Sequence, residues 1–153
     1  MTSQLPVGER GRQVYDRWAG VSGVYAVVDR LTRSLRRAAV GALELSAGAV
    51  ALDLGCGPGD SLDLLGAAAG ADGRIVGVDY STGMCDRAAD AAASVSGASV
   101  VRADAGSLPI ADGCVDGVLA SLSLSTMPHL DAVLAEVRRV LRPDGRLAVV
   151  DAR

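Results

Sequence analysis

Apolar residues gather in five short runs between residues 50 and 150, and glycine-containing or polar stretches separate these runs. Each run is too short for a typical helix, which favours a buried strand. The runs are residues 50–54, 74–79, 99–104, the segment that ends at Ser121, and 146–150. Segments with helical spacing lie between them, so the pattern predicts one α/β domain with a mostly parallel sheet.

The clearest helical pattern precedes the last strand. Residues 131–141 carry apolar side chains at positions 133, 134, 137, 140 and 141, which share one face of a helix. The following Arg-Pro-Asp-Gly predicts the end of this helix and a turn at 142–145.

The chain is expected to divide into three parts. Residues 1–9 have no periodicity and are expected to be loose. Residues 10–47 should form a helical cover, with Val27 and Leu35 on its apolar stripe and with a break at Gly20 and Gly23. Residues 48–153 should form the α/β core.

A glycine-rich turn follows the first strand. Residues 53–59 read Asp-Leu-Gly-Cys-Gly-Pro-Gly, so the strand ends abruptly, and Asp60 can cap the helix that follows. Gly55, Gly57 and Gly59 remove the side chains that would keep a ligand away from the backbone. We therefore expect the binding site of the chain at this turn.

The turn resembles the first motif of class I S-adenosylmethionine-dependent methyltransferases, which is an acidic residue, one further residue and then Gly-x-Gly-x-Gly. The resemblance implies a Rossmann-like three-layer sandwich, with five of the usual seven strands present, and S-adenosylmethionine as the cofactor. An NAD-dependent dehydrogenase is the alternative, but its Gly-x-Gly-x-x-Gly places the third glycine one residue later than Gly59. The Asp53 carboxylate would also serve a pyrophosphate poorly.

The resemblance implies a set of cofactor contacts. The family counterpart of Asp53 receives the cationic amino group of the methionine portion, and Asp79 lies about 20 residues after the turn, where a carboxylate suits two ribose hydroxyls. Met84 lies in the first turn of a helix that Ser81 can cap, where an apolar side chain can lie against adenine. Asp104 resembles the position that faces the adenine amino group. The predicted cofactor residues are Asp53, Gly55, Cys56, Gly57, Gly59, Asp79, Tyr80, Met84, Asp104, Ala105 and Ser121.

Residues 121–129 follow the fourth strand and should line the substrate side of the crevice. The only histidine, His129, is a candidate general base, and helix packing or exposure is the alternative. Tyr15 lies in a stretch similar to one that often closes over the cofactor in ubiquinone- and menaquinone-type methyltransferases. Its hydroxyl is a candidate substrate contact, and a plain lid aromatic is the alternative. Because the cofactor is strongly activated, positioning can supply most of the catalysis.

Charge, hydropathy and cysteine spacing argue against several classes of protein. A net charge of −3 without a general basic excess argues against long nucleic acid as a partner. The sequence shows no apolar run long enough for a transmembrane segment and no secretory leader, so we expect a cytoplasmic protein. The three cysteines lack metal-ligand spacing, so reduced thiols and no metal site are expected. A basic face on the cover helix is expected to be solvated; it consists of Arg30, Arg33, Arg36 and Arg37.

Members of the resembled family normally carry an antiparallel pair of strands beyond the fifth, whereas residue 153 follows directly after it. The fifth strand is then expected to have an open edge, through which a homodimer can form. The first interpretation is a methyltransferase that acts on a small-molecule acceptor with a carbon, oxygen or nitrogen nucleophile. The second is a non-catalytic S-adenosylmethionine-binding module or a truncated fragment that needs a partner.

Overall fold

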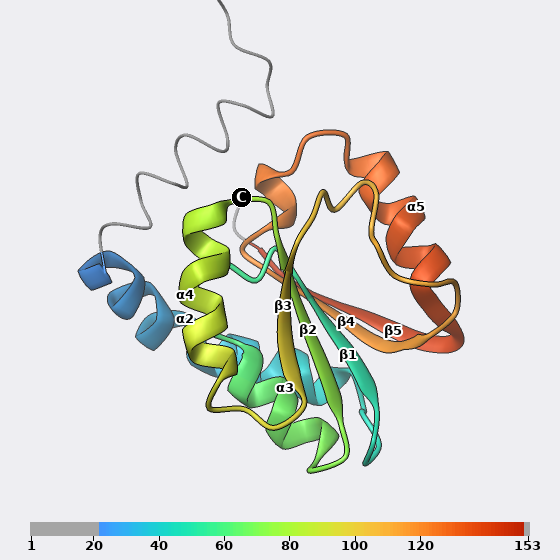
Figure 1. The fold of residues 1–153 in the computed structure, drawn as a ribbon, viewed down its shortest axis with the longest axis horizontal. Helices are drawn as coiled ribbons and strands as arrows, with labels where there is room; N and C mark the ends of the chain where they lie inside the picture. The colour runs from blue at the N-terminus through green and yellow to red at the C-terminus, as the bar shows by residue number, and fades with distance from the viewer. Residues whose placement is uncertain (1–21, 152–153) are drawn as a thin grey trace, which may run out of the picture.

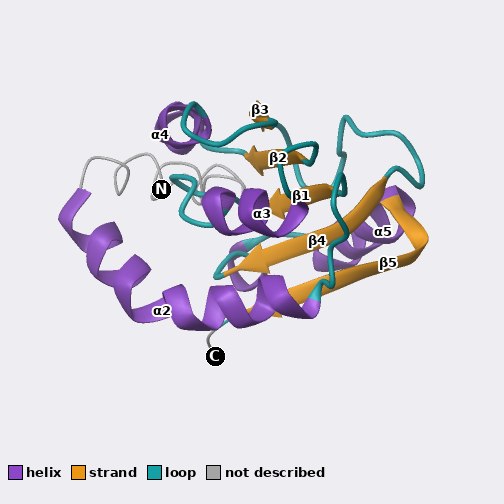
Figure 2. Ribbon diagram, turned by 90° about the horizontal axis from the view of Figure 1, so that it is seen from below, coloured by secondary structure: helices purple, strands orange, loops and turns teal. Residues whose placement is uncertain are grey.

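A computed structural model describes residues 22–151 of the chain. Its centre is a parallel sheet of β1 (Val50–Leu54), β2 (Arg74–Asp79), β3 (Ala98–Arg102), β4 (Val115–Ser121) and β5 (Leu141–Val150). The strands lie in the order β3-β2-β1-β4-β5, which Figure 2 shows from one end of the sheet to the other. The predicted strands and their parallel arrangement are confirmed.

Helices cover both faces of this sheet. They are α2 (Ser22–Ala42), α3 (Leu62–Ala69), α4 (Thr82–Ala92), the short 3-10 helix η1 (Leu124–Thr126) and α5 (Leu130–Val140). Figure 1 shows α2, α3 and α4 on one side of the sheet and α5 on the other. Right-handed crossovers explain this, because the strand order runs one way from β1 to β3 and the other way from β4 to β5. The predicted Rossmann-like three-layer sandwich is confirmed.

The central strands are buried on both faces. In β1, Ala51 belongs to an apolar cluster with residues of α2 and α3, while Leu52 and Leu54 belong to a cluster with residues of α5. Successive side chains of a strand point to opposite faces, so β1 contributes to both clusters. Full burial of each leucine stabilises the fold by roughly 1.5–3 kcal/mol relative to exposure. A doubly buried strand reads as a nearly continuous apolar run, and in β1 only Asp53 interrupts it.

The junction between α5 and β5 differs from the prediction. The helix ends where expected to within one residue, but residues 142–145 do not form a separate turn. They lie inside β5 as an irregularity in the ladder, because pairing with β4 passes from Leu141 directly to Arg146. Pro143 has no N–H group to donate to a ladder, which accounts for the interruption. Regular pairing begins at Arg146, the expected start of the strand.

The cover helix is continuous over its described length. Gly23 lies in the first turn of α2, so the break expected at this residue is not observed; Gly20 lies outside the described residues. The helix contacts α3, β4 and β5. Just after α2, Glu44 forms an ion pair with Arg146 of β5 at 2.7 Å, which joins the end of the helix to the sheet.

The inward face of α2 is not the one that the apolar pattern predicted. Val27 and Leu35 are 60% and 56% exposed. The buried residues of the second half of the helix are instead Arg36 and Val40, with Leu43 just beyond its end. These three positions follow an i, i+4, i+7 spacing and therefore share one face. The prediction failed because an arginine occupies one of the inward positions.

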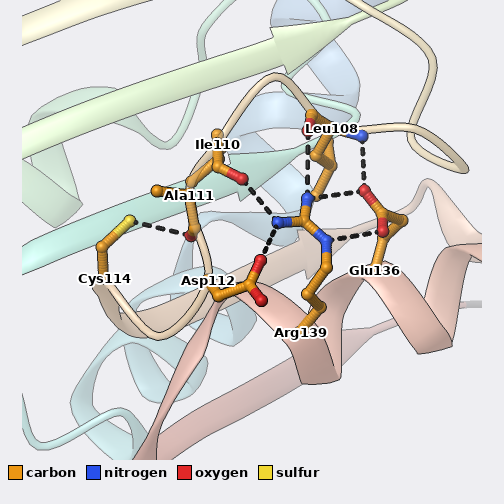
Figure 3. A network of polar contacts seen from close by, with 7 residues as sticks. All are labelled: Leu108, Ile110, Ala111, Asp112, Cys114, Glu136 and Arg139. Atoms are coloured by element: carbon orange, nitrogen blue, oxygen red, sulfur yellow. Dashed lines mark hydrogen bonds and ion pairs between the residues drawn. The ribbon is translucent and has the colours of Figure 1, made fainter.

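Arg139 of α5 fixes the loop between β3 and β4 (Figure 3). Its Nη1 donates to the Ile110 carbonyl oxygen and to Asp112, both at 2.7 Å, and its Nη2 donates to the Leu108 carbonyl oxygen at 3.0 Å. Glu136 accepts hydrogen bonds from Arg139 and from the Leu108 N–H group. These bonds, led by the one from Arg139, lower the pKa of Glu136 to about 2. Both backbone and side-chain groups of the loop are thus held against α5.

Replacing Glu136 with glutamine should change the pH dependence of stability. The ordinary pKa of this carboxyl is 4.5 and its folded value is about 2, so its stabilising contribution is present above about pH 4.5 and is lost as the pH falls toward 2. We expect Glu136→Gln to be less stable than the wild type at pH 7, but to lose less stability between pH 7 and pH 3. Urea unfolding at several pH values measures this.

The control variant is Asp144→Asn, which removes an exposed carboxylate of β5. It should follow the wild-type curve. Parallel curves for the wild type and Glu136→Gln would contradict the assigned role of the carboxylate.

Candidate functional site

A cavity of about 380 Å³ opens at the carboxyl ends of the strands. It lies beside the neighbouring strands β1 and β4, where the strand order of the sheet reverses. Ligands of open α/β sheets bind at such a switch point, and the volume falls in the range of small-molecule sites. The lining residues come from α2, the glycine turn, β1, the ends of β2 and β4, the first turn of α4, the loop after β3, residues 122–129 and α5.

Most of the predicted cofactor residues line this cavity. They are Asp53, Gly55, Cys56, Gly57, Asp79, Tyr80, Met84, Asp104, Ala105 and Ser121. Gly59 is the exception, because it lies against α4: a β-carbon at this position would come within 2.9 Å of the Ala91 Cβ and 3.1 Å of the Ala88 Cα. With a φ of +92°, Gly59 permits the close packing of the turn on that helix rather than a contact with the cavity.

The other two glycines of the turn also have separate roles. At Gly55, where φ is +69°, a β-carbon would lie only 2.6 Å from the Ser123 Cβ. The missing side chain at this position therefore makes room for residues 122–129. At Gly57, where φ is +54°, a β-carbon would meet no atom within 4 Å. Gly57 is therefore the glycine of the turn at which a missing β-carbon leaves open space, and the expected ligand contacts of the three glycines stay a prediction.

Asp79 joins the glycine turn to the start of α4. Its Oδ2 accepts a hydrogen bond from the Gly57 N–H group and its Oδ1 accepts one from the Ser81 N–H group, both at 2.9 Å. Ser81 is the N-cap of α4, as predicted, and its Oγ accepts from the Met84 N–H group at 3.3 Å. Because a carboxylate oxygen can accept more than one hydrogen bond, Asp79 can hold this geometry and also receive ligand hydroxyls.

Asp53 is a buried carboxyl group, only 2% exposed, near the end of β1. Burial raises its pKa to about 7; the Arg36 guanidinium opposes this rise, and the carboxylates of Asp60 and Asp79 add to it. Asp60 was expected to cap the following helix, but the N-cap of α3 is Ser61 and Asp60 lines the cavity. Near neutral pH, Asp53 is therefore poised to ionise when a cationic group arrives beside it.

Arg36 is a site residue that the sequence interpretation missed. The basic face of the cover helix was expected to be solvated, and Arg30 and Arg37 are indeed exposed. Arg36 is only 4% exposed and lines the cavity, so the expectation is wrong for this residue. Its helical spacing with Val40 and Leu43 is the sequence signal that could have identified it.

Residues 122–129 form the side of the cavity that was predicted to face the substrate, and their fold was not predicted. They contain η1, which is held by Asp151: its carboxylate accepts from the N–H and the Oγ of Ser125, both at 2.8 Å. The Leu122 N–H group also donates to the Val150 carbonyl oxygen at 2.6 Å. The end of β5 thus positions this segment, a long-range contact that no local motif signals.

Of the two candidate catalytic residues, the structure describes only His129. His129 lines the cavity in a left-handed conformation with φ of +56°, at the start of α5. Its use as a general base stays a prediction. Tyr15 lies outside the described residues. The Ser121 Oγ, by contrast, is buried without a hydrogen-bond partner in the protein, which suits a polar atom that a ligand would satisfy.

Within residues 22–151, no group of three or more histidine, cysteine or acidic side chains is arranged to hold a metal ion. Cys56, Cys85 and Cys114 are free thiols, and burial raises the pKa of Cys56. A thiol with a raised pKa is a poor nucleophile at neutral pH. None of the described helices is both long and apolar enough to cross a membrane.

Fold and cavity together define a class I, Rossmann-like methyltransferase domain. Residues 52–149 match the family described as a methyltransferase domain, and the chain belongs to this family. A 2-phytyl-1,4-naphtoquinone methyltransferase of Synechococcus elongatus is 36% identical to it, over 65% of this chain and 44% of the relative. The chain spans 34 to 62% of the length of such curated relatives.

Two solved structures illustrate the same likeness. A chain in the complex between the Haloferax volcanii Trm112 methyltransferase activator and the putative methyltransferase has a TM-score of 0.77 and 26% identity, over 88% of this chain and 58% of that chain. The cyclase SpnF has a TM-score of 0.66 and 34% identity, over 79% of this chain and 43% of that chain.

The different roles of Gly57 and Gly59 predict different costs of an alanine substitution. Both residues have a positive φ, which an alanine adopts at a cost of about 1–2 kcal/mol. Gly59→Ala should destabilise the fold by roughly 1–3 kcal/mol more than Gly57→Ala, because only its β-carbon meets α4. Urea unfolding of both variants measures the difference, and equal losses of stability would refute the distinction.

Proposed function

We propose that this chain binds S-adenosylmethionine in the cavity and transfers its methyl group to a small-molecule acceptor. The observation that carries the proposal is the placement of the acidic residues Asp53, Asp79 and Asp104, which come from β1, β2 and the loop after β3 and line one cavity beside the glycine turn. This arrangement fits a ligand with a cationic amino group, ribose hydroxyls and an aromatic base. The family match supports the same cofactor.

The lining residues complement the successive parts of the cofactor. Asp79 would hold the ribose hydroxyls, and the buried Met84 would lie against the adenine, whose amino group Asp104 would face. Asp53 would receive the amino group of the methionine portion. When bound, the cofactor supplies a methyl group on an activated sulfonium sulfur. The protein then has to orient the acceptor and exclude water, which are effects of positioning rather than of a dedicated catalytic group.

Residues 121–129 would face the acceptor. The buried Ser121 Oγ offers a polar contact, and the His129 imidazole is available for proton removal when the acceptor needs it. A quinone-related acceptor agrees with the name of the Synechococcus relative. A small-molecule partner in the cytoplasm, without nucleic acid, stays our prediction, as does a homodimer through the edge of β5, a strand that pairs only with β4 among the described strands.

A second candidate function is cofactor binding without methyl transfer. The similarity to SpnF supports this alternative. SpnF has the same fold, but its name describes a cyclase rather than a methyltransferase. Binding of the cofactor product and turnover of a supplied acceptor separate the two functions.

Calorimetric titration with S-adenosylhomocysteine tests the cofactor site. We expect micromolar binding by the wild type and a loss of at least roughly tenfold in Asp79→Ala, because a charged acceptor of hydrogen bonds is removed. Asp90→Ala on the exposed surface of α4 is the control and should bind normally. Binding of NAD in place of S-adenosylhomocysteine would support a dehydrogenase instead.

The titration should also depend on pH through Asp53. Its pKa is raised to about 7, so ionisation of Asp53 reduces the stability of the free protein as the pH rises from about 4 to about 7. A bound ammonium group favours the ionised form, so the affinity for S-adenosylhomocysteine should rise roughly tenfold between pH 6 and pH 7.5. Asp53→Asn should bind more weakly and without this rise. An equally steep rise in Asp53→Asn would exclude Asp53 as its source.

A further inference from the structure

Residues 122–129, the side of the cavity proposed to face the acceptor, begin and end in strained backbone. Leu122 has a φ of +54° and His129 has a φ of +56°. Residues other than glycine rarely adopt this left-handed conformation, and a bulky residue such as leucine is an outlier there. Such residues persist only where the surrounding structure holds them, and they cluster at functional sites. The contacts that hold this segment therefore bear on the function of the site.

One support of the segment comes from the strand beneath the cavity. Ser123 is only 6% exposed, and its Oγ donates a hydrogen bond to the Leu54 carbonyl oxygen, at the end of β1, at 2.8 Å. The Thr126 Oγ1 donates in turn to the Ser123 carbonyl oxygen at 2.7 Å. Because Ser123 also lies directly against Gly55, this support ties the start of the segment to the glycine turn.

A second support comes from outside the cavity. The Asp151 carboxylate accepts hydrogen bonds from the N–H group and the Oγ of Ser125, both at 2.8 Å. Six of the residues 122–129 line the cavity, but Ser125 is not among them, and neither is Asp151. The two bonds therefore hold the wall of the cavity from behind. Hydrogen bonds to a carboxylate are stronger than those between neutral groups, so this pair can restrain a strained segment although both residues are exposed.

Different elements thus hold the two halves of the cavity. On the cofactor half, the glycine turn and Asp79 of β2 bond directly to each other. The facing wall depends on the end of β5. Given the proposed function, on which this step rests, we propose that Asp151 is a positioning residue for the acceptor. It acts through Ser125 to keep residues 122–129 in the conformation that receives the acceptor, and it takes no part in binding the cofactor.

The opposing explanation is a purely structural one, in which Asp151 fastens the end of β5 and stabilises the fold as a whole. The two explanations differ in how far the effect of a substitution extends. Loss of a positioning contact loosens residues 122–129 and weakens ligands of the acceptor half. A general loss of stability affects the whole sheet and both halves of the cavity.

Hydrogen exchange measured by mass spectrometry tests the positioning role without any ligand. In Asp151→Ala, peptides that cover residues 122–129 should exchange at least roughly tenfold faster, because Ser125 loses both bonds, while peptides of β1 and α3 keep the wild-type rate. Asp151→Asn, which keeps one acceptor oxygen but not the charge, should lie between the two. Asp144→Ala, which removes an exposed carboxylate elsewhere in β5, is the matched control and should exchange like the wild type. Unchanged exchange in Asp151→Ala, or faster exchange throughout the sheet, would overturn the assignment.

A double variant shows whether Asp151 acts through Ser125. Ser125→Ala removes the Oγ donor but keeps the N–H group, so its exchange should rise less than that of Asp151→Ala. Adding Ser125→Ala to Asp151→Ala should cause no further rise, because the shared contact is already lost. Additive effects of the two substitutions would refute a role through Ser125.

Calorimetric titration then compares the two halves of the cavity. Asp151→Ala should bind S-adenosylhomocysteine within about twofold of the wild type. The probe of the acceptor half is 1-naphthol, a fused aromatic ring with one hydroxyl group, which is titrated into protein saturated with S-adenosylhomocysteine. Asp151→Ala should bind 1-naphthol at least roughly fivefold more weakly, because the wall that receives it is no longer preorganised.

Equal weakening of both ligands in Asp151→Ala, or no weakening of 1-naphthol, would contradict a positioning role toward the acceptor. A wild type that does not bind S-adenosylhomocysteine refutes the proposed function instead. One that binds S-adenosylhomocysteine but not 1-naphthol refutes the quinone-related acceptor. In both of these cases the exchange rates, which need no ligand, still decide whether Asp151 positions residues 122–129.

Discussion

The Val78 carbonyl oxygen, at the end of β2, accepts two hydrogen bonds from the glycine turn, one from the Gly55 N–H group at 2.8 Å and one from the Cys56 N–H group at 2.9 Å. In the parallel ladder, Val78 is also the partner of the last residue of β1. The sheet therefore sets the position of the turn, and Asp79 adds a third bond from the next residue of β2. This junction therefore positions the cavity, its carboxylates and the start of α4.

The same junction brings several acidic side chains together around the buried Asp53. Asp53, Asp60 and Asp79 approach one another at the cavity, and burial together with mutual repulsion favours the neutral form of Asp53. Arg36 opposes this effect from α2. A cationic group of a ligand beside Asp53 would offset this repulsion and favour the ionised carboxylate.

The sequence predicted those features of the fold that depend on residues close to one another in the chain. The doubly buried strand β1, the glycine turn and the N-cap at Ser81 each follow from residue type and spacing within a few positions. The cavity could also be located, because ligand sites of parallel sheets lie at the carboxyl ends of the strands. Most of the predicted cofactor residues line this cavity for the same reason.

The features that escaped the sequence interpretation depend on contacts between distant segments. The packing of Gly59 against Ala88 and Ala91 of α4, about 30 residues further along the chain, was not predicted. Arg36 was assigned to solvent, because a basic residue within an arginine-rich helix is normally exposed and the phase of the helix was not known. The conformation of residues 122–129 depends on Asp151 and Val150 at the end of β5. No local pattern encodes the contacts of Gly59 or of residues 122–129.

A crystal structure of the chain with S-adenosylhomocysteine tests the central claim most directly. The account predicts that the ligand lies along the carboxyl ends of β1 and β2, with its ribose hydroxyls on Asp79 and its amino acid portion toward Asp53. A ligand bound elsewhere, or in the reverse orientation with its nucleoside toward Asp53, would contradict the account of this cavity.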